Sequence, residues 1–143
     1  MLKLDVLRRQ HRAIRVLLQA LRTTRVDTPD GRSLLHLARN AILNHLHEED
    51  LEFYPLLTRN AAASALADAY FCEMRDVSRR TIAFFDACAG DGGADAFAAG
   101  FAAIHRLLLQ RMEREELHLY PACGGLLAAA SPGETTPSID LRG

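Results

Sequence analysis

HLHEEDLEFYP, residues 45–55, recurs as RMEREELHLYP at residues 111–121. The two segments align without gaps at a shift of 66 residues and share a glutamate, a leucine, a tyrosine and a proline, at Glu49/Glu115, Leu51/Leu117, Tyr54/Tyr120 and Pro55/Pro121. A weaker match sets residues 10–14 against residues 73–77. Because self-similarity at a fixed spacing is typical of a duplicated structural unit, we expect an internal repeat of one helical hairpin.

The stretches around both segments carry apolar residues at alternating steps of three and four, the period of a helix with one buried face. Four such stretches cover residues 4–21, 35–56, 67–88 and 97–122. Turn-forming residues separate them at residues 27–31, near Asn60 and at residues 89–95. Since short connections make successive helices neighbours, the sequence predicts an all-α, antiparallel up-down-up-down four-helix bundle built from two repeated helical hairpins.

Composition and length agree with one helical domain. The chain has 143 residues, of which 49% are hydrophobic and 24% are charged, and it lacks tryptophan. Helix formers such as Ala, Leu, Arg and Glu outnumber the β-branched Val and Ile. We place the bundle at residues 1–130. The segment 131–143 contains two prolines, two glycines and few apolar residues, and is expected to be a flexible C-terminal tail.

Charge and cysteine content exclude several functional classes. The chain has 17 Lys+Arg against 18 Asp+Glu, which argues against nucleic acid or an anionic membrane as a partner. No apolar run approaches the roughly 20 residues of a membrane span, and the N-terminus lacks a secretory apolar region. The three cysteines form no CxxC pair, so neither a disulfide framework nor a zinc ribbon is indicated. We therefore expect a cytoplasmic protein.

Polar residues interrupt the apolar stripes. His11 lies on the first stripe, and the second carries His45, Glu49 and Glu52. Burying such groups costs free energy unless a partner satisfies them. His45 and Glu49 are four residues apart, on one face of a helix, where His11 from the neighbouring helix can join them. Imidazole together with carboxylate suits iron, manganese or zinc, so we expect a metal site. The fourth stripe carries Arg111, Glu115 and His118.

These residues resemble the hemerythrin-like, or HHE cation-binding, family of four-helix bundles over residues 1–127. The resemblance implies a carboxylate-bridged di-iron centre. Its ligands would be a His from the first helix, His-x-x-x-Glu from the second, a His from the third and His-x-x-x-Glu or a close variant from the fourth. It also implies oxygen binding, or sensing of oxygen, iron or redox state. The matching metal ligands in this sequence are His11, His45, Glu49 and Glu115.

Two of the family's ligand positions are altered. The third-helix histidine is replaced by Met74 and the fourth-helix histidine by Arg111. A thioether is a poor ligand for hard iron, and a guanidinium cannot be deprotonated to bind a metal. We therefore expect one iron ion rather than two, with zinc or manganese as other ions that suit the site. Glu48 matches an acidic position found near the metal in some members of the family. His118, in Glu115-x-x-His118, is a further candidate ligand.

The sequence thus predicts a hemerythrin-like metal-binding protein with an incomplete non-haem iron site, acting as a sensor, a store or a ligand-binding bundle for a small ligand such as oxygen. Two alternatives stay open. One is a metal-free scaffold in which Arg111 neutralises Glu49 and Glu115 and which works through a protein partner or a homodimer. The other is a di-iron oxidase that uses His118. No nucleophile with an adjacent base and no phosphate loop is present. We therefore expect no enzymatic activity, since a metal site is the only candidate catalytic machinery.

Overall fold

The computed structural model describes residues 4–59 and 64–123, which are helical apart from short connections. The elements are α1 (Leu4–Thr23), α2 (Pro29–Glu48), η1 (Glu49–Phe53), α3 (Tyr54–Thr58), α4 (Ser64–Ala89), α5 (Gly93–Arg114) and η2 (Glu115–Leu119). The segments η1 and η2 are π-helices. Within the described ranges there is no strand, so the predicted all-α fold class is confirmed.

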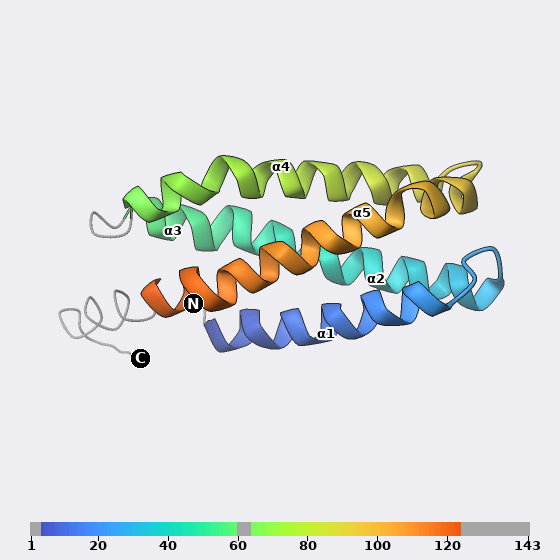
Figure 1. Cartoon of the computed structure of the whole chain (residues 1–143), viewed down its shortest axis with the longest axis horizontal. Coiled ribbons are helices and arrows are strands. Elements are labelled where there is room, and N and C mark those ends of the chain that lie inside the picture. The colour runs from blue at the N-terminus through green and yellow to red at the C-terminus, as the bar shows by residue number, and fades with distance from the viewer. Residues whose placement is uncertain (1–3, 60–63, 124–143) are drawn as a thin grey trace.

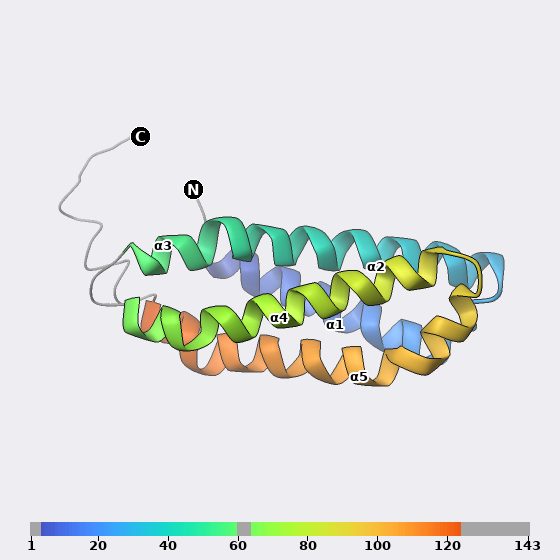
Figure 2. The ribbon, with the colours of Figure 1, turned by 90° about the horizontal axis from the view of Figure 1, so that it is seen from above.

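The long helices lie side by side along one axis, and α2, η1 and α3 form one continuous rod (Figures 1 and 2). The α1–α2 and α4–α5 connections lie at one end of the bundle, and the start of α1 and α3 lie at the other (Figure 1). Helix α1 contacts α2 and α5, and α4 contacts the same two helices. The molecule is therefore a four-helix bundle, as the periodicity of the sequence predicts. None of the described helices is long and apolar enough to cross a bilayer.

The first break between helices lies earlier in the chain than the sequence predicts, and the break between α4 and α5 is shorter than predicted. Residues 29–31, assigned to a turn, form the first turn of α2, because the Thr28 hydroxyl caps the helix by accepting from the Gly31 amide and Pro29 suits the first helical position. Helix α5 begins at Gly93, directly after Gly92, whose φ of 74° is left-handed. The break expected near Asn60 and the tail expected at 131–143 lie outside the described residues.

The buried interior has two apolar clusters with a polar layer between them. Along α1, Leu7 belongs to one cluster and Ile14 to the other, and the buried His11 lies between them. The same order holds in the second and fourth helical rods, where Glu49 and Glu115 separate the clusters. All four rods contribute buried polar side chains: His11, His45, Glu49, Ser78, Thr81, Arg111 and Glu115. This layer holds the candidate site.

Both π-helices begin at the glutamates that align at the shift of 66, Glu49 and Glu115. A π-helix closes its hydrogen bonds over one residue more than an α-helix, so the inner face moves on by one position. Glu52 and His118, which an uninterrupted α-helical period places inside, are exposed, while Phe53 and Leu119 are buried. The inner-face placement of His118 is therefore corrected: it lies on the outer face of η2.

Candidate metal centre

Four buried side chains converge in the polar layer. His11 comes from α1, His45 from the last turn of α2, and Glu49 and Glu115 from the first residues of the two π-helices. Each offers one ligand atom, and these atoms all lie within 4.8 Å of one another. The structure thus brings together the four residues that the sequence names as candidate ligands.

Two atoms of this cluster are buried without a hydrogen-bond partner, the His45 Nε2 and the Glu115 Oε1. Nε2 of His45 lies 3.2 Å from Oε1 of Glu49, and Nε2 of His11 lies 3.2 Å from Oε1 of Glu115. Buried polar atoms are almost always paired, and an unpaired one costs free energy. Imidazole nitrogens beside carboxylate oxygens are the donor set that iron, zinc and manganese accept, so the residues present fit one such ion.

Each histidine is held by a hydrogen bond to its outer nitrogen. The His45 Nδ1 donates to Gln10 Oε1 over 2.6 Å, and the Gln10 amide donates to Glu48. The His11 Nδ1 donates to Glu116 Oε2 over 2.6 Å, and Arg15 binds both oxygens of that carboxylate. A proton on Nδ1 leaves Nε2 unprotonated, and in both rings Nε2 faces the cluster. Nε2 of His11 also lies 3.2 Å from the Tyr120 hydroxyl.

Two buried tyrosines donate hydrogen bonds to the carboxylates. The Tyr54 hydroxyl donates to Glu115 Oε2 over 2.9 Å, and the Tyr120 hydroxyl donates to Glu49 Oε2. Each tyrosine therefore binds the glutamate of the other repeated segment. Sequence reasoning did not assign either tyrosine to the site, although its signal was available, because the Tyr-Pro pair recurs in both segments. Gln10 and Glu116 were missed too, and no motif marks them.

Arg111 lies on the α4 side of the layer, where it contacts Met74 and Ser78. Its side chain is 1% exposed. It donates five hydrogen bonds, from Nε to Glu115 (3.3 Å), from Nη1 to the Met74 carbonyl (2.9 Å) and Ser78 (2.7 Å), and from Nη2 to Glu49 (3.1 Å) and Asp50 (3.2 Å). A guanidinium has five N–H donors, so every one of them is used.

The charges in the layer shift the pKa values of its groups. Burial raises the pKa of Glu49, but the adjacent His45 imidazole and the charge of Arg111 outweigh burial and hold that pKa below its usual range. Burial and the neighbouring Glu49 charge raise the pKa of Glu115 well above its ordinary value. Burial lowers the pKa of His11, which favours the neutral imidazole that a metal needs. The layer therefore suits an additional cation beside Glu115.

The remaining candidates lie outside the cluster. Glu48 accepts a hydrogen bond from Gln10 and is linked to His45 through that side chain. Met74 is buried in the apolar cluster below the site and contributes its backbone carbonyl to Arg111. The exposed His118 is not among the four clustered residues. Because Arg111 donates to Glu49, to Glu115 and to the Met74 carbonyl, the residues present do not fit a second ion beside Arg111.

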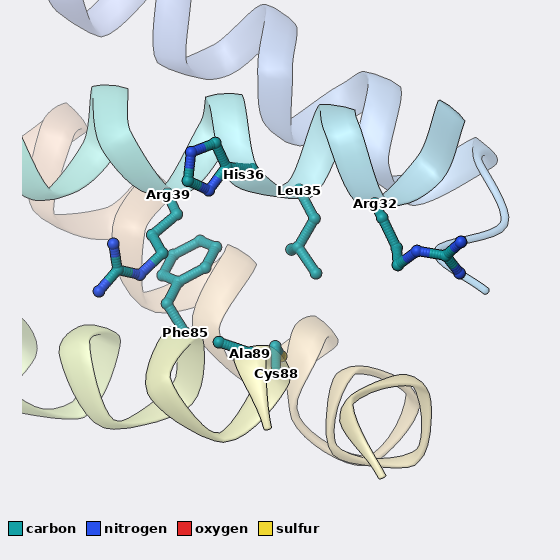
Figure 3. Close-up of a pocket in the computed structure, with 7 residues that line it drawn as sticks. All are labelled: Arg32, Leu35, His36, Arg39, Phe85, Cys88 and Ala89. Atoms are coloured by element: carbon teal, nitrogen blue, oxygen red, sulfur yellow. The ribbon is translucent and has the colours of Figure 1, made fainter. Parts of the chain in front are cut away.

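A separate cavity of about 240 Å³ lies between α2 and α4 and is lined by Arg32, Leu35, His36, Arg39, Phe85 and Cys88 (Figure 3). Its two arginines, Leu35 and His36 come from α2, and Phe85 and Cys88 come from α4 (Figure 3). None of the four clustered residues lines it. The cavity is therefore no part of the candidate metal centre.

Fold and site together define a four-helix bundle with a buried histidine–glutamate cluster of the kind that holds a metal ion. Residues 2–57 match the hemerythrin HHE cation binding domain. For residues 2–57, the part of the chain that contains His11, His45 and Glu49, this match confirms the resemblance predicted from the sequence. Searches of curated proteins and of solved structures found no match to the chain.

Proposed function

We propose that this chain binds one divalent metal ion through His11, His45, Glu49 and Glu115 and serves as a sensor, a store or a ligand-binding bundle. The observation that carries the proposal is the pair of partnerless buried atoms, His45 Nε2 and Glu115 Oε1, inside a cluster of four ligand atoms within 4.8 Å. A cation between them would satisfy both atoms and the excess negative charge of the two glutamates.

Iron is the ion that we propose, with zinc and manganese as alternatives. Two imidazoles and two carboxylates suit all three, and the match of residues 2–57 to a cation binding domain supports a resident ion. When bound, ferrous iron supplies a one-electron redox couple and a coordination position for a small ligand such as oxygen. The chain's own part is to present both Nε2 atoms, to orient the rings through Gln10 and Glu116, and to exclude water by burial.

We further infer that the chain is an internal duplication and that it resides in the cytoplasm. The duplication is supported by the two π-helices, which begin at the aligned glutamates Glu49 and Glu115. The cytoplasmic location is supported by the free thiols of Cys72, Cys88 and Cys123, because reducing compartments keep thiols unpaired.

A metal-free scaffold is the second candidate, and one observation favours it. Arg111 already donates to both Glu49 and Glu115, so part of their negative charge is neutralised without an ion. Such a scaffold would act through a protein partner or a second copy of the chain. The di-iron oxidase alternative has lost its support, because His118, the ligand on which it depended, lies outside the cluster.

The test is metal content per chain after anaerobic loading with ferrous iron and desalting. We expect about one ion in the wild type and none in His45→Ala, since that variant loses one of the two imidazoles. His47→Ala, an exposed histidine of the same helix, is the matched control and should keep its ion. Iron retained in His45→Ala would refute the ligand set. An empty wild type whose melting temperature is indifferent to chelator would establish the scaffold.

A further inference from the structure

We propose that Arg111 is a built-in cation in the place of a second metal ion, and that it holds the single ion of this site in the divalent state. This inference rests on the proposed function, because it concerns the same cluster. It goes beyond that function by assigning a residue that determines both how many ions are bound and which oxidation state is favoured.

The two glutamates connect the histidine side of the layer to Arg111. Oε1 of Glu49 lies 3.2 Å from His45 Nε2 and 3.1 Å from Arg111 Nη2. Glu115 places one oxygen 3.2 Å from His11 Nε2 and the other 3.3 Å from Arg111 Nε. Glu115 therefore contacts a histidine with one oxygen and a guanidinium with the other, as a bridging carboxylate contacts two cations, whereas Glu49 contacts both through Oε1.

Arg111 cannot easily be displaced by a metal ion. A guanidinium keeps its proton throughout the accessible pH range, and here all five of its N–H donors are paired. A second ion would have to expel a buried charge from this network or share the space with it. Both are unfavourable, because an unpaired buried charge is strongly destabilising. The number of ions is thus limited to one.

The charge of the layer matches one divalent ion. When a bound cation keeps Glu115 ionised, Glu49, Glu115 and Asp50 each carry a negative charge and contact Arg111, which carries one positive charge, so the group has an excess of two negative charges. A divalent ion balances this excess, whereas a trivalent ion leaves a positive charge in a layer where Glu49 and Glu115 are wholly buried. Buried charges are screened much less than exposed ones, so Arg111 should disfavour oxidation of ferrous iron.

The experiment compares the wild type with Arg111→Gln and Arg111→Lys in a mediated redox titration of the iron-loaded proteins, with iron content measured in parallel. Removing the positive charge in Arg111→Gln should favour ferric over ferrous iron by at least about tenfold, which lowers the potential by about 59 mV or more for one electron. It should also admit iron beyond one ion per chain. Arg111→Lys keeps the charge and should stay close to the wild type in both measurements.

Asp50→Asn provides a second variant with the opposite sign, in case Arg111→Gln does not fold. Asp50 is partly exposed, and asparagine can still accept a hydrogen bond from Arg111. Loss of its negative charge should favour ferrous iron and raise the potential.

The outcomes separate this inference from the proposed function. A wild type with one ion, but with unchanged potential and iron content in Arg111→Gln, or unchanged potential in Asp50→Asn, would overturn the inference alone. Iron on none of these proteins would overturn both. Iron in Arg111→Gln but not in the wild type would refute the proposed function and support exclusion of metal by Arg111.

Discussion

The two sides of the polar layer use the same pair of glutamates in different ways. On one side His11 and His45 present Nε2 atoms to the glutamates, and two atoms of the cluster lack any hydrogen-bond partner. On the other side Arg111 has all five donors paired, and Met74 offers only a backbone carbonyl. The negative charge of a buried carboxylate can thus be balanced in two ways. A side-chain cation such as Arg111 balances it without any ligand, whereas the histidine side of the layer needs a bound cation.

The largest expected effect comes from removing Arg111, because all five of its N–H donors are already paired. Arg111→Ala would leave Glu49 and Glu115 buried without their cation, and the free energy of unfolding should fall by about 3–5 kcal/mol. Urea denaturation measures this change. Arg114→Ala is the control, since its pair with Glu73 is largely exposed, and it should change stability by less than about 1 kcal/mol. Equal effects of the two substitutions would show that the buried network does not stabilise the fold.

A smaller effect is expected on the incomplete side. Gln10→Ala removes the partner of His45 Nδ1 without touching a candidate ligand, so the metal should bind about 10- to 100-fold more weakly while the fold persists. Competition with a chelating indicator gives the affinity. Gln19→Ala, an exposed glutamine on the same helix, should bind as the wild type does. Unaltered affinity in Gln10→Ala would mean that packing alone orients His45.

The smallest effect is expected at His118 and tests whether this residue is a metal ligand. His118 is exposed on η2, so His118→Ala should leave the iron content of the loaded protein unchanged, and the free energy of unfolding should change by less than about 0.5 kcal/mol. Iron content and urea denaturation measure both. A loss of iron in this variant would place His118 at the metal and would restore the hypothesis that Glu115-x-x-His118 supplies two ligands.

The helical stripes were predictable because a buried face repeats with the period of the helix. In α1 the stripe from Leu7 to Leu21 is buried as expected, with His11 inside it. The prediction failed only after Glu49 and Glu115, where a constant period of 3.6 places Glu52 and His118 inside. One additional residue in each π-helix shifts the buried face by one position along the chain. No local pattern in the sequence predicts that additional residue.

The sequence by itself determined the four helices and the identity of the four clustered residues, because helical spacing within each segment and resemblance to a known ligand pattern depend on neighbours in the chain. Only the tertiary structure decided which side chains form hydrogen bonds with these four residues. The partners of His11 and His45 are Glu116 and Gln10, and Tyr54 and Tyr120 reach Glu115 and Glu49, all across separations of 35 residues or more. Contacts between distant segments arise from packing of whole helices, so no local spacing encodes them.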